Sequence, residues 1–229
     1  MKYRNALLIV LLIILVDQVV KVYIKTHFCL GEEVKMAGEW AKLHFLENEG
    51  MAFGMKISQS HWGKLVLSLF RLVAVVFGFA MLRQLCRKGY ANGLIVCGAM
   101  ILAGALGNLI DSTFYGLIFT ESPTTYHFTT ACEPAKLVAF GQGYGRLFHG
   151  RVVDMLYFPI ARIPLPGGRS FEFFEPVFNI ADAAISVGVI VLIIFQKKLL
   201  RKRDDVLVDE PSAPAPDAHS TVAREPDAE

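Results

Sequence analysis

Residues 175–195 read EPVFNIADAAISVGVIVLIIF, a run apolar enough to cross a bilayer that still carries Asn179 and Asp182 in its first turns. An aspartate at the centre of a spanning helix costs roughly 2.5–3.5 kcal/mol on insertion scales. Such a residue therefore persists only where a cavity, a partner or a function stabilises it. The same question arises at Asp17, Asp111 and Asp154. Any account of the fold has to explain these aspartates.

The composition identifies the class of protein. The chain has 229 residues, of which 54% are hydrophobic, and its mean hydropathy is +0.45. These values are too apolar for an ordinary soluble domain of this length, so we expect an integral membrane protein. The net charge of +2 is too small to suggest a nucleic-acid partner.

Apolar segments of sufficient length predict a bundle of spanning helices, since the hydrocarbon core requires about 20 residues. The predicted spans are Ala6–Tyr23, Lys64–Leu82, Gly93–Ile110 and Val177–Phe195. The first begins like a signal peptide, but no A-x-A-like cleavage site follows it, so we expect it to be retained. In the third, Ala99, Ala103 and Gly107 recur every four residues, a pattern that lets another helix approach closely.

Basic residues flank these spans at three places, which predicts the orientation of the chain. They are Lys2 and Arg4, then Arg83, Arg87 and Lys88, then Lys197, Lys198, Arg201, Lys202 and Arg203. By the positive-inside rule all three regions are cytoplasmic, and residues 26–63 and 112–176 are extracytoplasmic. The acidic, Pro- and Ala-rich residues 204–229 predict a disordered cytoplasmic tail after a membrane domain of residues 1–203.

Polar residues fall on single helical faces within two of the spans. Asp17 and Lys21 are four residues apart, which is compatible with an ion pair at the membrane boundary with a snorkelling lysine, or with a functional role. Asn179, Asp182 and Ser186 also share a face. A purely structural role is less favoured there, because an asparagine could form hydrogen bonds without the cost of a charge.

The predicted topology brings Asp154 and Asp182 to the same extracytoplasmic level of the membrane. Two carboxyl groups in one poorly solvated site tend to share a proton. Such a pair can hydrolyse an amide, because one partner activates water and the other protonates the leaving nitrogen. The alternative is a small proton-coupled transporter or an assembly factor that uses Asp17, Asp111 and Asp182 as a relay.

Five motifs, taken in order, resemble those of the lipoprotein signal peptidases, also called signal peptidase II. They are DQVVK from residue 17, ENEGMAFG from 47, GALGNLID from 104, VVDMLYF from 152 and FNIADAAISVG from 178. The resemblance implies an aspartic endopeptidase of the bacterial inner membrane that cuts a signal peptide before a diacylglyceryl-modified cysteine. Its catalytic pair falls on Asp154 and Asp182. The matching supporting positions are Asp17, Lys21, Asn48, Gly50, Asn108, Asp111, Asn179 and Ala181.

The resemblance also implies an architecture and a set of partners. We expect an α-helical membrane protein with four transmembrane helices, a small extracytoplasmic β-cradle from residues 29–53 and an interfacial helix at His61–Ser68. The partners would be a lipid-modified prolipoprotein and membrane lipids, without nucleic acid or a cofactor, and the chain is expected to be a monomer.

The chain departs from the family pattern at two places. Ser112 stands where the family usually has an arginine, and Arg146 or Arg151 are the candidates to replace it. The connection between residues 112 and 151 is also much longer than usual for the family, and it could form an added extracytoplasmic hairpin or a lid.

Metal and redox chemistry are not indicated. The chain has no HExxH motif, and His44, His61, His127 and His149 lack ligand spacing, so no metal is expected. A presenilin-type protease is disfavoured because the GxGD motif is absent. The four cysteines show no CxxC spacing, which favours apolar packing. Cys29 and Cys132 share the predicted extracytoplasmic side and could form a disulfide.

Overall fold

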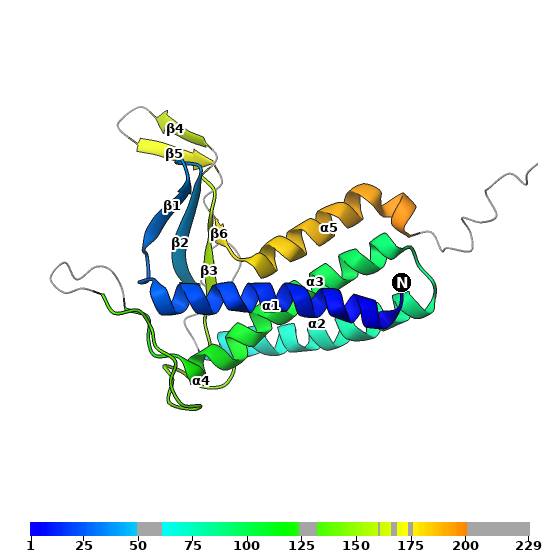
Figure 1. The fold of residues 1–229 in the computed structure, drawn as a ribbon, viewed down its shortest axis with the longest axis horizontal. Coiled ribbons are helices and arrows are strands. Elements are labelled where there is room, and N and C mark those ends of the chain that lie inside the picture. The colour runs from blue at the N-terminus through cyan, green and yellow to red at the C-terminus, as the bar shows by residue number, and fades with distance from the viewer. Residues whose placement is uncertain (50–60, 124–131, 160, 166–168, 174–175, 201–229) are drawn as a thin grey trace, which may run out of the picture.

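A computed structural model describes residues 1–49, 61–123, 132–159, 161–165, 169–173 and 176–200. Gly50 and the predicted tail of residues 204–229 lie outside the described residues. The helices are α1 (Tyr3–His27), α2 (His61–Arg87), α3 (Asn92–Ile110), the π-helix η2 (Asp111–Tyr115), α4 (Gly116–Ile118) and α5 (Ile180–Leu199). The long helices run side by side, and the strands gather at one end of the bundle (Figure 1).

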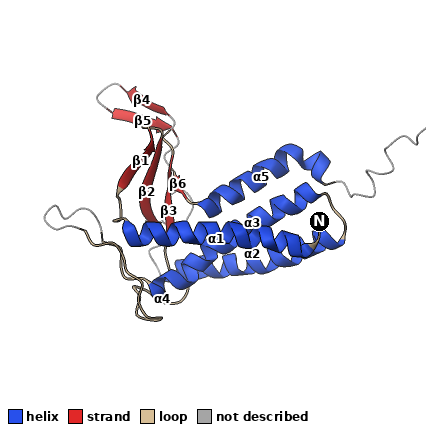
Figure 2. Cartoon of the chain, viewed as in Figure 1, coloured by secondary structure: helices blue, strands red, loops and turns tan. Residues whose placement is uncertain are grey.

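The strands form two antiparallel sheets in the part of the chain that is described. The larger has the order β1 (Glu33–Ala37), β2 (Ala41–Asn48), β3 (Val152–Tyr157) and β6 (Val177–Phe178). The smaller pairs β4 (Ala161–Leu165) with β5 (Arg169–Phe173). Figure 2 shows the larger sheet beside the end of α1 and the start of α5. The predicted helical bundle with a small β-cradle is therefore confirmed.

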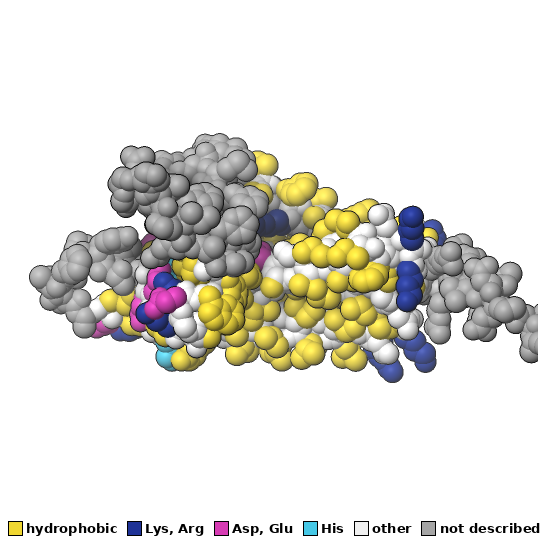
Figure 3. All heavy atoms as spheres, turned by 90° about the horizontal axis from the view of Figure 1, so that it is seen from above, with side chains coloured by type: hydrophobic (Ala, Val, Ile, Leu, Met, Phe, Trp, Pro, Cys, Tyr) yellow, Lys and Arg dark blue, Asp and Glu magenta, His cyan; other side chains and the backbone are white. Residues whose placement is uncertain are grey.

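The bundle has the surface of a membrane-spanning protein. Four helices among the described residues are long and apolar enough to cross a bilayer. Large apolar side chains such as Leu12, Phe70 and Ile194 are more than 60% exposed, which suits contact with lipid. On the face shown in Figure 3, hydrophobic side chains cover the helices, while Lys and Arg gather at the end remote from the sheet.

The residues of the predicted interfacial helix, His61–Ser68, do not form a separate helix. These residues form the first turns of α2, which continues without a break to Arg87. The apolar run that follows carries the helical hydrogen bonds on into the bilayer, where each unsatisfied backbone group would be costly. The other predicted spans are correct within a few residues at each end.

Helices α3 and α5 approach closely because small residues line their contact. A Cβ on Gly104 would lie 2.2 Å from the carbonyl oxygen of Ala181 and 2.6 Å from Cγ1 of Ile185. Ala99 and Ala103 of the predicted small-residue face are fully buried, in the core shared with α1 and α2. Gly104, one residue away from the predicted pattern, is thus the position where the two backbones come closest.

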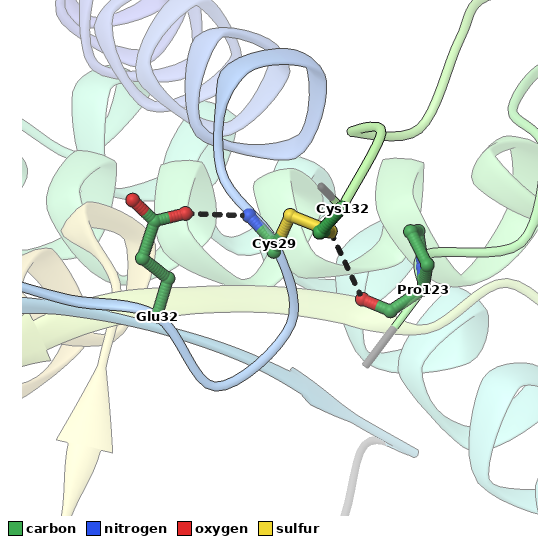
Figure 4. The surroundings of a disulfide bond; sticks show 4 residues. All are labelled: Cys29, Glu32, Pro123 and Cys132. Atoms are coloured by element: carbon green, nitrogen blue, oxygen red, sulfur yellow. Dashed lines mark hydrogen bonds between the residues drawn. A yellow bond between two sulfur atoms is a disulfide. The ribbon is translucent and has the colours of Figure 1, made fainter. Parts of the chain in front are cut away.

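The connection after α3 packs against the rest of the protein instead of forming a separate lid in its described part. Phe119 is fully buried in a cluster with Ile24, Phe45 and Met155. A disulfide joins Cys132 of this connection to Cys29, just after α1, beside Pro123 and Glu32 (Figure 4). The Cys29–Cys132 pair left open by the sequence is therefore formed.

Candidate active site

The first turn of α5 fixes Asp182 through a capping box. The Asn179 side-chain oxygen accepts a hydrogen bond from the Asp182 backbone N–H at 2.9 Å. The Asp182 carboxylate in return accepts from the Asn179 backbone N–H at 3.4 Å. This exchange satisfies N–H groups that a helix start leaves without intrahelical partners, and it explains why α5 begins at Ile180 and not at Val177.

Asp154 reaches the same point from the sheet. It lies in β3, which β2 and β6 flank, and it is 3% exposed. The Asn179 side-chain nitrogen donates to its Oδ1 at 2.7 Å, and the Asn48 side chain forms a second hydrogen bond to it. Asn179 therefore contacts both aspartates, one through each end of its amide group.

Asn108 of α3 forms a second bridge at this point. Its side-chain nitrogen donates to Oδ1 of Asp182 at 2.7 Å. Its side-chain oxygen accepts from Asn179 at 3.1 Å and from the Lys21 ammonium at 2.9 Å. The residues expected at 154, 182, 108 and 179 thus form one connected hydrogen-bond network across three elements.

The environment of Asp154 favours a bound proton. Burial removes water from its carboxyl group, and the negative charge of Asp182 adds repulsion. Together they raise the pKa of Asp154 to about 7, although the hydrogen bonds from Asn179 and Asn48 and the charge of Lys21 act in the opposite direction. The protonated form of Asp154 therefore persists up to neutral pH.

Asp17, Lys21 and Asp111 form a buried ion cluster behind the pair. The Lys21 ammonium lies 2.9 Å from Asp17 Oδ2 and 2.8 Å from Asp111 Oδ2, and all three side chains are at most 1% exposed. With Asn108, each of its three N–H donors has an acceptor. The predicted ion pair exists, but the snorkelling geometry is wrong, because Lys21 points inward.

The ion cluster also ties two backbone segments to α1. Asp17 Oδ1 accepts from the backbone N–H of Ala181 at 2.9 Å, and Asp111 Oδ2 accepts from that of Val153 at 3.3 Å. Each bonded residue immediately precedes one of the paired aspartates. The cluster therefore holds both aspartates in place from behind, and it gives Ala181 its role.

Gln18 completes this cluster, and sequence reasoning missed it. Its side-chain nitrogen donates to Asp111 at 2.8 Å and to Asp17 at 3.1 Å, and its oxygen accepts from the Tyr115 hydroxyl at 3.2 Å. The signal was present, since Gln18 lies within the motif DQVVK beside Asp17.

The π-helix η2 brings the chain before β3 against Asp111. The backbone N–H of Gly150 donates to the Ser112 carbonyl at 2.8 Å. A Cβ on Gly150 would lie only 2.0 Å from the Asp111 carbonyl oxygen, so no other residue fits without displacing the backbone. This close approach sets the position from which β3 presents Asp154.

Among the described hydrogen bonds and salt bridges, neither Arg146 nor Arg151, the two candidates to replace the arginine expected at position 112, contacts Ser112. Arg151 forms salt bridges with Glu47 and Glu121 at the rim, and the structure gives Arg146 no contact with Ser112. Instead, Arg71 of α2 donates to the Ser112 hydroxyl at 3.0 Å. The sequence offered no motif around Arg71, so it was not singled out.

A second buried ion network, unexpected from the sequence, lies toward the sheet. The Lys25 ammonium, fully buried, pairs with Glu47 and donates to Ser122 at 2.9 Å. Burial alone would raise the pKa of Glu47, but Lys25, Ser122 and Arg151 outweigh it and hold that pKa below its usual range. Lys25 is one turn beyond Lys21 on the same helical face, which is the signal that could have revealed it.

Three comparisons with known proteins bear on this site. The family model described as signal peptidase (SPase) II matches residues 9–197. A lipoprotein signal peptidase of Porphyromonas gingivalis is 45% identical over 196 residues, covering 82% of this chain and 80% of the relative. Those of Amoebophilus asiaticus and Chlorobium phaeobacteroides are each 29% identical, and they cover 85% and 83% of this chain and 78% and 94% of their own.

Two solved structures share the fold. Both are described as bacterial membrane enzymes determined by the in meso method. The one at 2.3 Å has a TM-score of 0.54 at 23% identity and covers 91% of this chain and 94% of its own. The one at 1.9 Å has a TM-score of 0.52 at 24% identity, with 85% and 93% covered. The chain therefore belongs to the signal peptidase II family, the lipoprotein signal peptidases, and is an aspartic peptidase of the bacterial inner membrane that removes signal peptides from prolipoproteins.

Proposed function

We propose that Asp154 and Asp182 are the catalytic pair of this peptidase. The observation that supports the proposal most directly is their convergence on one asparagine: the Asp154 carboxyl group accepts from the Asn179 side-chain nitrogen, and the Asp182 backbone N–H donates to the Asn179 side-chain oxygen. Their environments differ, because Asp154 is almost fully buried and has its pKa raised to about 7, whereas Asp182 is more accessible. Such a difference assigns the acid and the base.

In the proposed reaction, Asp182 removes a proton from a water molecule. At the same time the water oxygen attacks the carbonyl carbon of the residue before the substrate cysteine. Protonated Asp154 donates to the carbonyl oxygen as the tetrahedral intermediate forms. As the intermediate collapses, Asp182 gives the proton taken from water to the cysteine nitrogen, the C–N bond breaks, and a hydroxyl proton of the intermediate returns to Asp154. The products are a signal peptide with a new carboxylate and a protein with a new amino terminus.

The remaining site residues would support this pair. Asn108 and Asn179 orient the carboxylates, Asn48 contacts Asp154, and Asp17, Lys21 and Asp111 anchor the backbone beside them. Ala181 packs its small side chain against α3, and its backbone N–H donates to the Asp17 carboxylate. The supporting role expected for Gly50 stays a prediction.

We also propose the orientation and the substrate form. The basic ends of the bundle face the cytoplasm with both termini, and the carboxylates lie near the periplasmic face. The substrate carries its diacylglyceryl group during cleavage, with the lipid chains entering laterally between helices. The enzyme acts as a monomer of one membrane domain, residues 1–203, followed by the cytoplasmic tail.

A proton relay through Asp17, Asp111 and Asp182 has less support. Asp17 and Asp111 both bind the Lys21 ammonium, whose donors are all used. Both carboxylates are also bound to the backbone beside the paired aspartates, at Ala181 and Val153, which favours a structural role.

The test is gel-shift cleavage of a lipid-modified precursor by purified protein with Asp154→Asn or Asp182→Asn, in the presence of a chelator. Both variants are expected to lose cleavage while the protein still inserts and stays folded. Cleavage at the wild-type rate by either variant would overturn the assignment. An unlipidated precursor run in parallel tests the lipid requirement, which equal turnover of the two substrates would contradict.

A further inference from the structure

The guanidinium group of Arg71 occupies a position that the family motif does not anticipate. It enters from α2, is half-buried, and donates to the hydroxyl of Ser112, the residue that directly follows Asp111. The Ser112 hydroxyl donates its proton to the Asn108 carbonyl oxygen at 2.9 Å, so in its hydrogen bond with Arg71 it can only accept. The serine is thus the hydrogen-bond acceptor for an arginine from another helix.

The surroundings of this guanidinium are acidic. The negative charges that act on it belong, in decreasing order, to Asp182, Asp111 and Asp154. Asp111 is already bound by Lys21 and Gln18 in the ion cluster. Asp182 has no lysine or arginine among its described hydrogen-bond and salt-bridge partners, which are Asn108 and the backbone of Asn179. Arg71 is therefore positioned to supply positive charge to Asp182, which pairs with no lysine or arginine in the described part of the chain.

We propose that Arg71 is a positioning residue of the active site that takes over, from α2, the charge which related peptidases place directly after the aspartate of GNLxD. It acts through Ser112, whose hydroxyl donates to the carbonyl oxygen of Asn108, the residue that binds Asp182, and it places a positive charge beside the pair. The proposal rests on the assignment of these two aspartates as the catalytic pair.

The electrostatic setting makes the expected direction definite. The charged groups around the pair are Asp111 from η2, Asp17 and Lys21 from α1, and Arg71 from α2. Removing Arg71 takes one positive charge from this set and leaves the carboxyl groups in place, so the pair of Asp154 and Asp182 binds protons more tightly. Cleavage would then fail at low pH first, and its acid limb would move to higher pH.

The experiment compares kcat, KM and the pH profile of cleavage for purified variants. Arg71→Leu is expected to lower kcat about 10- to 100-fold with little change in KM, and to shift the acid limb upward. Arg71→Lys, which retains the charge, should stay within a few-fold of wild type. The double variant Arg71→Leu/Ser112→Arg returns a guanidinium to the usual position and should recover most of the lost rate.

Arg83→Leu is the matched control, since it removes an exposed arginine from the same helix. Wild-type kcat and an unshifted acid limb in Arg71→Leu would overturn the proposal, as would a folded Arg71→Leu that the added Ser112→Arg change fails to rescue. Thermal unfolding of each variant identifies a loss of fold, in which case Arg71→Lys and the double variant decide. If the aspartate variants still cleave, the catalytic assignment fails separately, whatever Arg71 does.

Discussion

The carboxyl group of Asp154 makes cleavage depend on pH in a definite direction. Burial and the nearby charge of Asp182 raise its pKa to about 7, so the protonated form needed for the acid step persists up to neutral pH. Above that pH the proton is lost, and kcat should fall about tenfold per unit well into the alkaline range. A pH profile of kcat with a saturating lipid-modified precursor measures this limb.

The carboxyl group of Asp154 also makes the stability of the folded state fall as pH rises, whereas an aspartate with a lowered pKa makes it rise. A carboxyl group whose folded pKa is raised stabilises the folded state fully below its unfolded pKa and loses that contribution as pH rises through the folded value. Wild type should therefore lose thermal stability relative to Asp154→Asn between pH 5 and pH 8, because asparagine carries no such charge. A constant difference in Tm across that range, or a pH profile flat through neutrality, would contradict the raised pKa.

At single residues, the sequence was informative where a charge interrupts an apolar run. Asp17, Asp111 and Asp182 are costly in a membrane, so each had to have a partner or a purpose, and the structure gives each one a specific contact. The contacts of Arg71 and Glu47 could not be predicted from the sequence, for the same reason. Their partners, Ser112 and Lys25, lie far away in the sequence, and only the tertiary fold brings them together.

Among the elements, the contact of α3 with α5 determines where Asp182 sits. Gly104→Ala would place a Cβ 2.2 Å from the Ala181 carbonyl oxygen, which belongs to backbone and cannot move aside alone. The helices must separate, and overpacking of this kind typically costs about 1–3 kcal/mol. We expect a lower Tm and a reduced cleavage rate, because Ala181 directly precedes Asp182, one of the two proposed catalytic aspartates.

Gly98→Ala on the same helix is the matched control. Its Cβ would meet only Leu82 and Leu85 side chains, at 3.6 Å and 3.7 Å, which are ordinary contact distances. Alanine also favours the helix by about 1 kcal/mol over glycine, so stability should hold or rise. Thermal unfolding and cleavage measured on both variants test the comparison, and equal behaviour of the two would show that the close approach at Gly104 is unimportant.

The positions of the spanning helices could be predicted from hydropathy, but their first and last residues could not. Spans of about 20 apolar residues are required by the bilayer, so four could be located directly. The start of α5 depends on the Asn179 cap, and the continuity of α2 through His61–Ser68 depends on the helix having no reason to break there. Where a helix begins or continues depends on local hydrogen bonds, which the hydropathy of the sequence does not reveal.

At the scale of the whole molecule, two independent contacts hold the connection after α3 against the end of α1. One is the disulfide between Cys29 and Cys132, and the other is the buried pair of Lys25 and Glu47, which Ser122 joins. Both contacts lie outside the network of aspartates and asparagines that holds the proposed catalytic pair. The stability of this region and the chemistry of the site should therefore be separable by mutation.

The double change Cys29→Ser/Cys132→Ser tests this separation. The two cysteines are 103 residues apart, and opening so long a loop in a soluble chain would cost at least about 2–4 kcal/mol. Here the bilayer keeps the spanning helices formed when tertiary contacts are lost, which shortens the effective loop, so the low end of that range is expected. Tm should fall by several degrees, while cleavage below the new Tm stays near wild type.

A reductant provides the internal check on that prediction, because it should lower the Tm of wild type to that of the double variant and leave the variant itself unchanged. Cys86→Ser, at an unpaired cysteine, controls for the loss of a thiol and should behave as wild type. If the double variant instead lost cleavage at temperatures where it is folded, the connection would have to reach the catalytic pair. In that case Asp111 provides the route, since η2 carries it at the start of the connection and it binds the backbone of Val153 beside Asp154.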